Sequence, residues 1–193
     1  MTTPNKQCTK EEEEPFPLLP ISSPQTIKAC SSLPLRSTDI FIASYPKSGT
    51  TWMQHIVHTL STNGNSPLKH ISDACPFFEV DQTWGKEEEE TTTNNGSSTT
   101  TNLAKSVNEN HNAINRRIFN THLRWEYMPQ NGPSEKDTKN ARYIYMIRRP
   151  DDACVSFYHH LSHQSIEDGG YSGSFDDFVH DFTHAGNMPY GTW

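Results

Sequence analysis

One eight-residue segment, Tyr45–Trp52 with the sequence YPKSGTTW, constrains the fold of this chain more than any other feature. The residues that lead into it, Asp39–Tyr45, are apolar and β-branched, as in a short buried strand, and Pro46 ends that strand. After it, the apolar side chains between residues 52 and 60 recur at helical spacing. The sequence therefore predicts a strand, a tight turn and a helix in immediate succession.

The turn of this unit carries the parts of an anion-binding cradle. Gly49 lets the backbone approach a ligand closely, and the first N–H groups of the following helix point outward there. Ser48, Thr50 and Thr51 supply hydroxyl donors, and Lys47 supplies a mobile positive charge. The residue order excludes a Walker A loop, in which the lysine follows the last glycine. These residues alone leave open both a phosphate loop and an ordinary strand–helix turn.

Two further strand candidates complete a prediction of the fold class. Arg117–Thr121 is a second strand candidate, and Tyr143–Ile147 is a continuous apolar run typical of a strand covered on both faces. Pro150 and the two acidic residues after it indicate a helix start, and we expect that helix to run to about Leu161. The alternation predicts a single-domain α/β fold, with a central parallel sheet flanked by helices and a P-loop-like phosphate-binding turn.

Composition divides the chain into a domain and two polar stretches. Only 32% of the residues are hydrophobic. The deficit is concentrated in residues 1–37, rich in Pro, Ser and Glu, and in residues 86–102, which read KEEEETTTNNGSSTTTN. We expect a disordered or loosely ordered lead-in and a low-complexity surface insertion, because neither stretch can bury an apolar face. Residues 38–193 then form the domain.

Charge and cysteine usage bear on partners and compartment. The formal net charge is −7 without a dense Lys or Arg run, so we expect neither nucleic acid nor a membrane as a partner. No window approaches the roughly 18 apolar residues of a membrane span, and the N-terminus lacks the apolar stretch of a signal peptide. The four cysteines form no CxxC pair, which favours thiols in a reducing compartment. We therefore expect a cytoplasmic protein.

Three polar residues mark further candidate positions. Arg148 ends the third apolar run, and Ser156 lies eight residues on, inside the following helix, where the two can hold a phosphate. His122 ends the second run, and a histidine is suited to act as a base at neutral pH. Taken alone, Arg148 is more simply a surface charge and His122 a structural histidine.

Together these segments resemble the cytosolic sulfotransferases, which use 3′-phosphoadenosine 5′-phosphosulfate (PAPS) as co-substrate. YPKSGTTW resembles the 5′-phosphosulfate loop of that family, and YMIRRPDDACVSFYHH resembles its 3′-phosphate segment. The resemblance implies that Lys47 contacts the bridging oxygen of the sulfate–phosphate bond and that Trp52 stacks on the adenine. It also implies that the 5′-phosphate is held by Ser48, Gly49, Thr50 and Thr51. The 3′-phosphate is then held by Arg148 and Ser156.

The same resemblance implies a catalytic base and an acceptor site. Asn120–Leu123 (NTHL) is similar to the family's K-T-H-L segment, which makes His122 the expected base and Lys47 the second catalytic residue. CPFFE resembles the acceptor-pocket loop, so Phe77 and Phe78 are expected to line the acceptor site, with an ordinary buried aromatic pair as the alternative. The implied reaction moves a sulfuryl group in line to a hydroxyl or amine of a small-molecule acceptor and requires no metal.

Two departures from the family pattern favour a second interpretation. Asn120 stands where the family has a lysine, and Arg117 and Arg124 flank it as candidate compensating cations. The resemblance ends at Gly186–Trp193, and the family's later R-K-G segment and dimerisation segment have no counterpart. We therefore expect a C-terminally truncated chain, without the segment through which a complete protein would form a homodimer. The leading hypothesis is a PAPS-dependent sulfotransferase, and the alternative is a non-catalytic nucleotide-binding remnant of the same fold.

Overall fold

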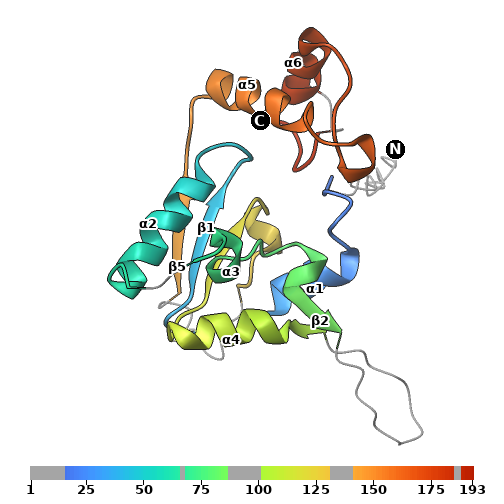
Figure 1. Cartoon of the computed structure of the whole chain (residues 1–193). Coiled ribbons are helices and arrows are strands. Elements are labelled where there is room, and N and C mark those ends of the chain that lie inside the picture. Colours follow the sequence, from blue (N-terminus) through green and yellow to red (C-terminus); the bar gives the residue numbers. More distant parts are fainter. Residues whose placement is uncertain (1–15, 66–67, 87–100, 131–140, 185–187) are drawn as a thin grey trace, which may run out of the picture.

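The computed structural model describes residues 16–65, 68–86, 101–130, 141–184 and 188–193. Figure 1 shows strands at the centre, helices packed around them, and a second group of helices above. The α-helices and strands are α1 (Pro24–Ser32), β1 (Ile40–Ser44), α2 (Thr50–Thr62), α3 (Ile71–Ala74), β2 (Trp84–Lys86), β3 (Thr101–Leu103), α4 (Lys105–Ala113), β4 (Ile118–Thr121), β5 (Arg142–Met146), α5 (Pro150–Leu161) and α6 (Phe175–His184). Short 3₁₀ turns occur at η1 (Asp81–Thr83), η2 (Trp125–Tyr127) and η4 (Ile166–Asp168).

The central sheet has the strand order β4-β1-β5, and both pairings are parallel. The middle strand, β1, is buried along most of its length, which explains its continuous apolar sequence IFIAS. The strands predicted at 39–45, 117–121 and 143–147 are each confirmed to within one residue. The prediction of a single-domain α/β fold with a parallel sheet is also confirmed.

Aromatic side chains fill one face of the sheet. Phe41 of β1 stacks on Phe119 of β4 and on Tyr143 of β5, with ring centroids 5.3 and 5.1 Å away. Phe78 packs edge-on against Phe41 at 5.2 Å. The three phenylalanines are fully buried, and burial of each contributes about 1.5–3 kcal/mol. This layer holds together the strands whose carboxyl ends carry the candidate site.

Helices α2 and α3 cover the opposite face. Val57 of α2 and Ile71 of α3 belong to one buried cluster with Ile42 and Ile118 of the sheet. Helix α2 begins at Thr50 directly after the turn that follows β1, as the sequence predicts. Its N-terminus therefore lies at the end of the sheet where the parallel strands finish (Figure 1).

A buried ion pair closes the other end of the sheet. Arg117, just before β4, donates Nε to Oδ1 of Asp39 at 2.8 Å, and the two side chains are 4% and 0% exposed. The backbone N–H of Arg36 donates to the same carboxylate at 2.7 Å, and Arg117 also donates to the carbonyl of Pro34 at 2.7 Å. The ion pair thus joins the starts of β1 and β4 to residues 34–36, which precede β1.

The predicted lead-in differs from the structure over part of its length. Residues 24–32 form helix α1, and Cys30, Leu33 and Leu35 are buried in the same core as the aromatic layer. The average composition of residues 1–37 does not reveal these few apolar positions. Their burial holds residues 24–35 against the sheet. Residues 1–15 of the predicted lead-in lie outside the described residues.

The predicted insertion at residues 86–102 lies mostly outside the described residues, but both of its ends are described. Strands β2 and β3 pair in an antiparallel manner, with Trp84 opposite Leu103. The two described ends of this stretch therefore lie side by side.

Helices α5 and α6 form an aromatic cluster of their own. Phe157 of α5 and Phe178 and Phe182 of α6 are buried there. The ring of Tyr45, which opens the phosphate-loop segment, lies 6.2 Å from that of Phe157 and 5.6 Å from that of Phe182. This contact fixes the position of the two helices relative to the loop. Helix α5 begins at Pro150, as the sequence predicts.

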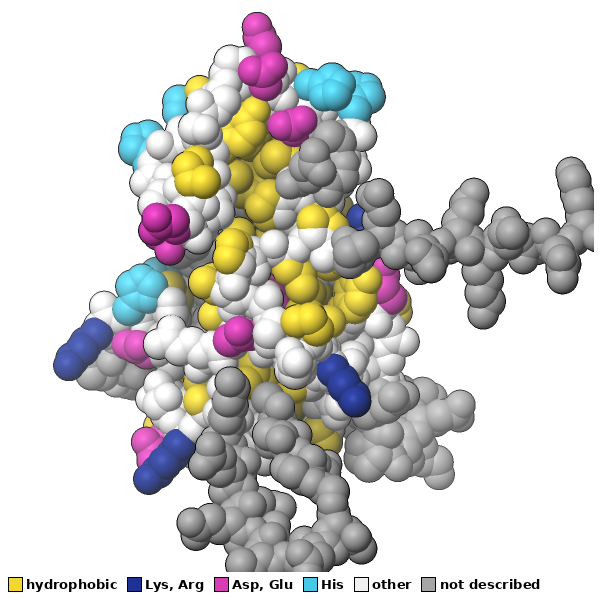
Figure 2. Space-filling model, turned by 90° about the vertical axis from the view of Figure 1, so that its right-hand side faces the viewer, with side chains coloured by type: hydrophobic (Ala, Val, Ile, Leu, Met, Phe, Trp, Pro, Cys, Tyr) yellow, Lys and Arg dark blue, Asp and Glu magenta, His cyan; other side chains and the backbone are white. Residues whose placement is uncertain are grey.

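The surface and the helix lengths bear on partners. On the face drawn in Figure 2, Lys and Arg side chains are few and far apart, while hydrophobic side chains lie between the upper helices and the rest of the molecule. The coloured residues of that face form no positive patch of the kind that nucleic acids require. Within the described ranges, no helix has both the length and the apolar character needed to cross a membrane.

Candidate functional site

The predicted anion cradle lies at the turn between β1 and α2. Lys47 and Gly49 have positive φ angles of 65° and 102°, which fold the chain tightly from strand to helix. Gly49 is the N-cap of α2, and it provides no side-chain cap. The first N–H groups of α2 are therefore left for a ligand, and the helix dipole adds partial positive charge at this point.

Glycine at position 49 is required by the backbone and not by a lack of space. A Cβ at Gly49 would meet the methyl group of Met146 at 3.8 Å, an ordinary contact. Because other residues rarely adopt its φ of 102°, Gly49→Ala should lower the free energy of unfolding by about 1–2 kcal/mol. Urea unfolding followed by circular dichroism measures this loss.

Gly64→Ala is the matched control for that substitution. Gly64 lies beyond the other end of α2, with a φ of 72° and open space where a Cβ would stand. The Gly64→Ala substitution should cost a similar amount of stability and leave anion binding unchanged, whereas Gly49→Ala should weaken anion binding as well. Equal stability of Gly49→Ala and the unmodified chain would contradict the backbone explanation.

The side chains of the loop differ in what they offer a ligand. Ser48 is buried, and its hydroxyl has no hydrogen-bond partner among the described residues. The hydroxyl of Thr50 shares a hydrogen bond of 3.2 Å with that of Ser44. Thr51 and Trp52 are exposed, Trp52 to 72%. A buried hydroxyl without a partner, beside an uncapped helix N-terminus, suits an anion, so these residues fit a phosphate group.

Two cations meet at the loop. Arg148, two residues beyond the end of β5, donates Nη1 to the backbone carbonyl of Lys47 at 2.8 Å. Burial lowers the pKa of the Lys47 ammonium, and the nearby Arg148 charge lowers it further. Ser156 is half-buried on α5. The resemblance assigns Lys47 to the 5′-phosphosulfate end of PAPS and Arg148 to its 3′-phosphate. In the structure the guanidinium of Arg148 contacts the backbone of Lys47.

His122 lies immediately after β4, beside the same loop. Its Nδ1 is 2.7 Å from the carbonyl oxygen of Ser44. A carbonyl oxygen only accepts hydrogen bonds, so Nδ1 carries the proton and the lone pair is on Nε2. Burial lowers the pKa of His122 to about 4; the hydrogen bond to Ser44 opposes this shift, and the Lys47 charge adds to it. The imidazole is therefore neutral at pH 7, with Nε2 able to accept a proton.

Lys47 and His122 line one pocket of about 380 Å³, a volume typical of small-molecule sites. Phe77 and Tyr190 form an aromatic wall, and each ring centroid is 5.2 Å from that of His122. Further lining residues come from α5 and the residues after it: His160, Leu161, Gln164 and Asp168. The pocket thus combines a neutral base and a cation with apolar and polar walls.

Phe77 and Phe78, both predicted to line the acceptor site, point in different directions. Phe77 lines the pocket beside His122. Phe78 is fully buried in the aromatic layer, with its ring centroid 4.8 Å from that of Phe119, so the prediction was wrong for Phe78. Residues 76–78 run alongside β4 as an extended segment, in which successive side chains point to opposite sides.

The two arginines named as candidates to compensate for the missing lysine make contacts elsewhere. Arg117 is held in the buried ion pair at the opposite end of β4. The guanidinium of Arg124 lies over the ring of Phe16, 4.7 Å from its centroid. Asn120 itself is bound through its backbone to the neighbouring extended segment, at 2.8 and 3.1 Å. Neither arginine lines the pocket that holds Lys47 and His122.

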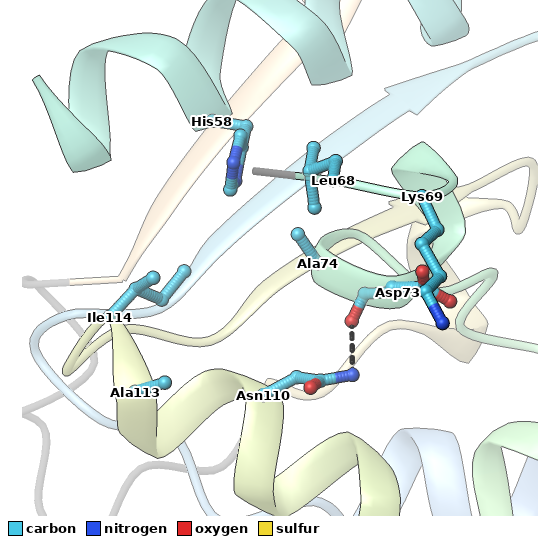
Figure 3. Close-up of a pocket in the computed structure, with 8 residues that line it drawn as sticks. All are labelled: His58, Leu68, Lys69, Asp73, Ala74, Asn110, Ala113 and Ile114. Carbon is cyan, nitrogen blue, oxygen red and sulfur yellow. Dashed lines mark hydrogen bonds between the residues drawn. The ribbon is translucent and has the colours of Figure 1, made fainter. Parts of the chain in front are cut away.

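A second hollow of about 220 Å³ lies between α2, α3 and α4, away from the phosphate loop. Figure 3 shows His58 reaching into it from α2, while Asn110 donates to the carbonyl of Asp73 at 2.7 Å on the other side. His58 is buried, and neither ring nitrogen has a hydrogen-bond partner among the described residues. Because Lys47, Phe77 and His122 line the pocket of about 380 Å³ instead, we place the candidate site there.

Several residues of the candidate site were not predicted from the sequence, among them Ser44, Tyr190 and His160. Ser44 contacts His122 through its backbone carbonyl, which any residue type would supply, so the sequence contains no pattern that identifies Ser44. Tyr190 belongs to the C-terminal segment, and its N–H donates to the carbonyl of Pro17 at 2.6 Å. His160 shares the pocket with Gln164, four residues on. Helical spacing from Phe157 would have identified that face of α5.

The chain matches known proteins over most of its length. A model of the sulfotransferase domain matches residues 37–193. Human sulfotransferase 4A1 is 26% identical over 166 residues, covering 84% of this chain and 48% of the relative. Human sulfotransferase 1E1 is 33% identical over 161 residues, covering 82% and 46%. The crystal structure of mouse sulfotransferase SULT7A1 complexed with PAP matches with a TM-score of 0.59 and 23% identity, covering 90% and 50%. This chain spans about half the length of these relatives.

Proposed function

Because the chain belongs to the sulfotransferase family, we propose that it transfers a sulfuryl group from PAPS to a hydroxyl or amine of a small-molecule acceptor. The observation that carries the proposal is the single pocket shared by His122 and Lys47, beside an uncapped helix N-terminus. A base, a cation and an anion cradle at one place are what sulfuryl transfer from a phosphosulfate requires.

The proposed reaction is one in-line displacement. The acceptor hydroxyl gives its proton to Nε2 of His122 while its oxygen forms a bond to the sulfur. The bond between that sulfur and the phosphate oxygen breaks, and 3′-phosphoadenosine 5′-phosphate (PAP) leaves. Lys47 stabilises the negative charge that develops on the leaving oxygen. The loop residues 48–51 and Arg148 hold the nucleotide, so that acceptor and sulfur are correctly placed.

The proposed acceptor is small and partly apolar. Phe77 and Tyr190 offer faces for a ring or an aliphatic skeleton, and His160 and Gln164 offer polar contacts on the other side. We further propose a cytoplasmic location, supported by buried free thiols in the described ranges at Cys30, Cys75 and Cys154.

Calorimetric titration with PAP tests the proposal without a choice of acceptor. Once circular dichroism shows that the chain is folded, PAP should bind, and Lys47→Ala and Arg148→Ala should each weaken binding about 10- to 100-fold. That is the factor expected for a lost hydrogen bond between charged groups. Lys28→Ala on α1 and Arg142→Ala at the other end of β5 remove exposed cations and serve as matched controls.

The outcomes separate clearly. Loss of PAP affinity in Lys47→Ala and Arg148→Ala, with both controls unchanged, supports the cradle. Equal affinity in all four variants contradicts the placement of the nucleotide. A folded chain that does not bind PAP at all contradicts the proposed function for this chain.

A non-catalytic nucleotide-binding protein of the same fold is the second candidate function. Asn120, in place of the family's lysine, is the observation that favours it, since both neighbouring arginines are engaged elsewhere. PAP binding without transfer from PAPS to 4-nitrophenol or to an aliphatic alcohol would select this candidate. Measurable transfer would exclude it.

A further inference from the structure

Glu79 is a fully buried acid beside the candidate site, and the chemistry above gives it no role. It lies 43 positions before His122 in the sequence, yet its Oε1 accepts the backbone N–H of His122 at 2.7 Å. Burial of a carboxyl group is costly unless its hydrogen bonds compensate. The bond to the backbone of the proposed base is the compensation seen at Oε1, while Oε2 is buried without a hydrogen-bond partner in the described ranges.

The backbone that carries Glu79 is firmly held. The N–H of Phe78 donates to the carbonyl of Asn120 at 2.8 Å, and the N–H of Asn120 donates to the carbonyl of Pro76 at 3.1 Å. The carbonyl of Phe78 accepts the indole N–H of Trp84 at 2.7 Å. Residues 76–78 thus run as an added extended segment beside β4. Glu79 follows directly, so its position relative to the end of β4 is fixed.

His122 is consequently held at two atoms. Its backbone N–H is bound by Glu79, and its Nδ1 donates to the carbonyl of Ser44. With the backbone anchored, the side chain reaches Ser44 beside the rings of Phe77 and Tyr190. We propose that Glu79 is a positioning residue, which fixes His122 in the orientation that keeps the proton on Nδ1 and the lone pair on Nε2. The inference rests on the proposed function in one respect only, namely that this orientation of His122 serves catalysis.

The groups that face Glu79 come from three parts of the chain. Cys30 of α1 and Tyr190 of the C-terminal segment both interact electrostatically with the carboxyl, and His122 provides the backbone donor. Burial raises the pKa of Glu79 to about 7, while the His122 N–H and then Thr121 oppose the rise. Either protonation state leaves Oε1 able to accept the N–H. Glutamine should therefore replace the acid in this role, and leucine should not.

Nuclear magnetic resonance on the full chain tests the proposal without turnover. In the unmodified chain and in Glu79→Gln, the His122 ring should show the Nδ1-protonated tautomer and titrate near pH 4. In Glu79→Leu the tautomer preference should weaken, and the pKa of His122 should rise toward its ordinary value of about 6.5 as the ring leaves its buried position. PAP affinity should be unchanged in both variants, because Glu79 makes no contact with the phosphate loop among the described residues.

Each outcome decides the matter. His122 spectra in Glu79→Leu that equal those of the unmodified chain would overturn the proposal, and so would equal changes in Glu79→Leu and Glu79→Gln. Glu126→Leu, which removes an exposed acid of η2, is the matched control and should leave His122 unaltered. Failure of the proposed function would appear as absent PAP binding or transfer, independently of these spectra.

A measurement on the unmodified chain covers the case in which Glu79→Leu does not fold. Because the His122 N–H donates directly to the carboxyl, its amide resonance should shift as Glu79 titrates near pH 7. The shift should be absent from Glu79→Gln, whose amide does not titrate. An amide resonance of His122 that shifts with pH in the same way in the unmodified chain and in Glu79→Gln would contradict its contact with the Glu79 carboxyl.

Discussion

His122→Ala should slow sulfuryl transfer about 10²- to 10⁴-fold, which is the usual contribution of a positioned general base. PAP should still bind, because the hydrogen bonds of His122 run to Ser44 and Glu79 and not to the residues proposed to hold the nucleotide. The measurement is the rate of PAP release from PAPS in the presence of 4-nitrophenol, together with a calorimetric titration with PAP.

The control for this substitution is His180→Ala, since His180 is an exposed histidine of α6. Its transfer rate should equal that of the unmodified chain. If His122→Ala keeps the full transfer rate, His122 is not the base. If it loses PAP affinity as strongly as Lys47→Ala does, its role lies in binding and not in proton transfer.

Arg117→Met should destabilise the chain by about 3–5 kcal/mol, the cost typical of breaking a buried ion pair. The substitution removes both Arg117 donors and leaves the Asp39 carboxylate fully buried, with the N–H of Arg36 as its remaining hydrogen-bond donor in the described ranges. That cost is a large share of the total stability of a domain, for which about 5–15 kcal/mol is usual. Urea unfolding measures the change.

The double variant Asp39→Asn/Arg117→Met should be more stable than Arg117→Met alone. It removes the uncompensated charge, and the asparagine oxygen can still accept the N–H of Arg36. The exposed pair Lys105–Glu109, with a distance of 3.9 Å, provides the contrast. Lys105→Met should change the free energy of unfolding by no more than about 0.5 kcal/mol. Similar costs for Arg117→Met and Lys105→Met would contradict the importance of burial.

Strands β1 and β5 could be predicted because each lies in a continuous apolar run, although the expected cover on both faces holds for β1 and not for β5, where Tyr145 is 68% exposed. The residue types of Asp39–Tyr45 and Tyr143–Ile147 are those typical of strands. The turn at Gly49 is indicated by the glycine and by the helical spacing of the apolar residues after it. The phosphate loop is equally local, since it occupies a single stretch of chain. Local signals of this kind survive without knowledge of tertiary contacts.

The pocket could be predicted only in part, because its walls depend on tertiary contacts. The direction of Phe78 follows from the pairing of residues 76–78 with β4, which no local pattern reveals. The role of Glu79 depends on the same pairing. Arg117 was a reasonable candidate cation until its partner, Asp39, was known. In each case a distant residue decides where the side chain points.

The way the pocket is assembled has an evolutionary consequence. The proposed nucleotide contacts lie mainly in one compact unit, the turn at residues 47–52 with Arg148 beside it. The proposed acceptor walls come from separate segments, among them Leu19, Phe77 and Tyr190. Substitutions in those segments can therefore change which acceptor fits while the nucleotide contacts stay intact. One donor chemistry can in this way be kept while acceptor preference diverges.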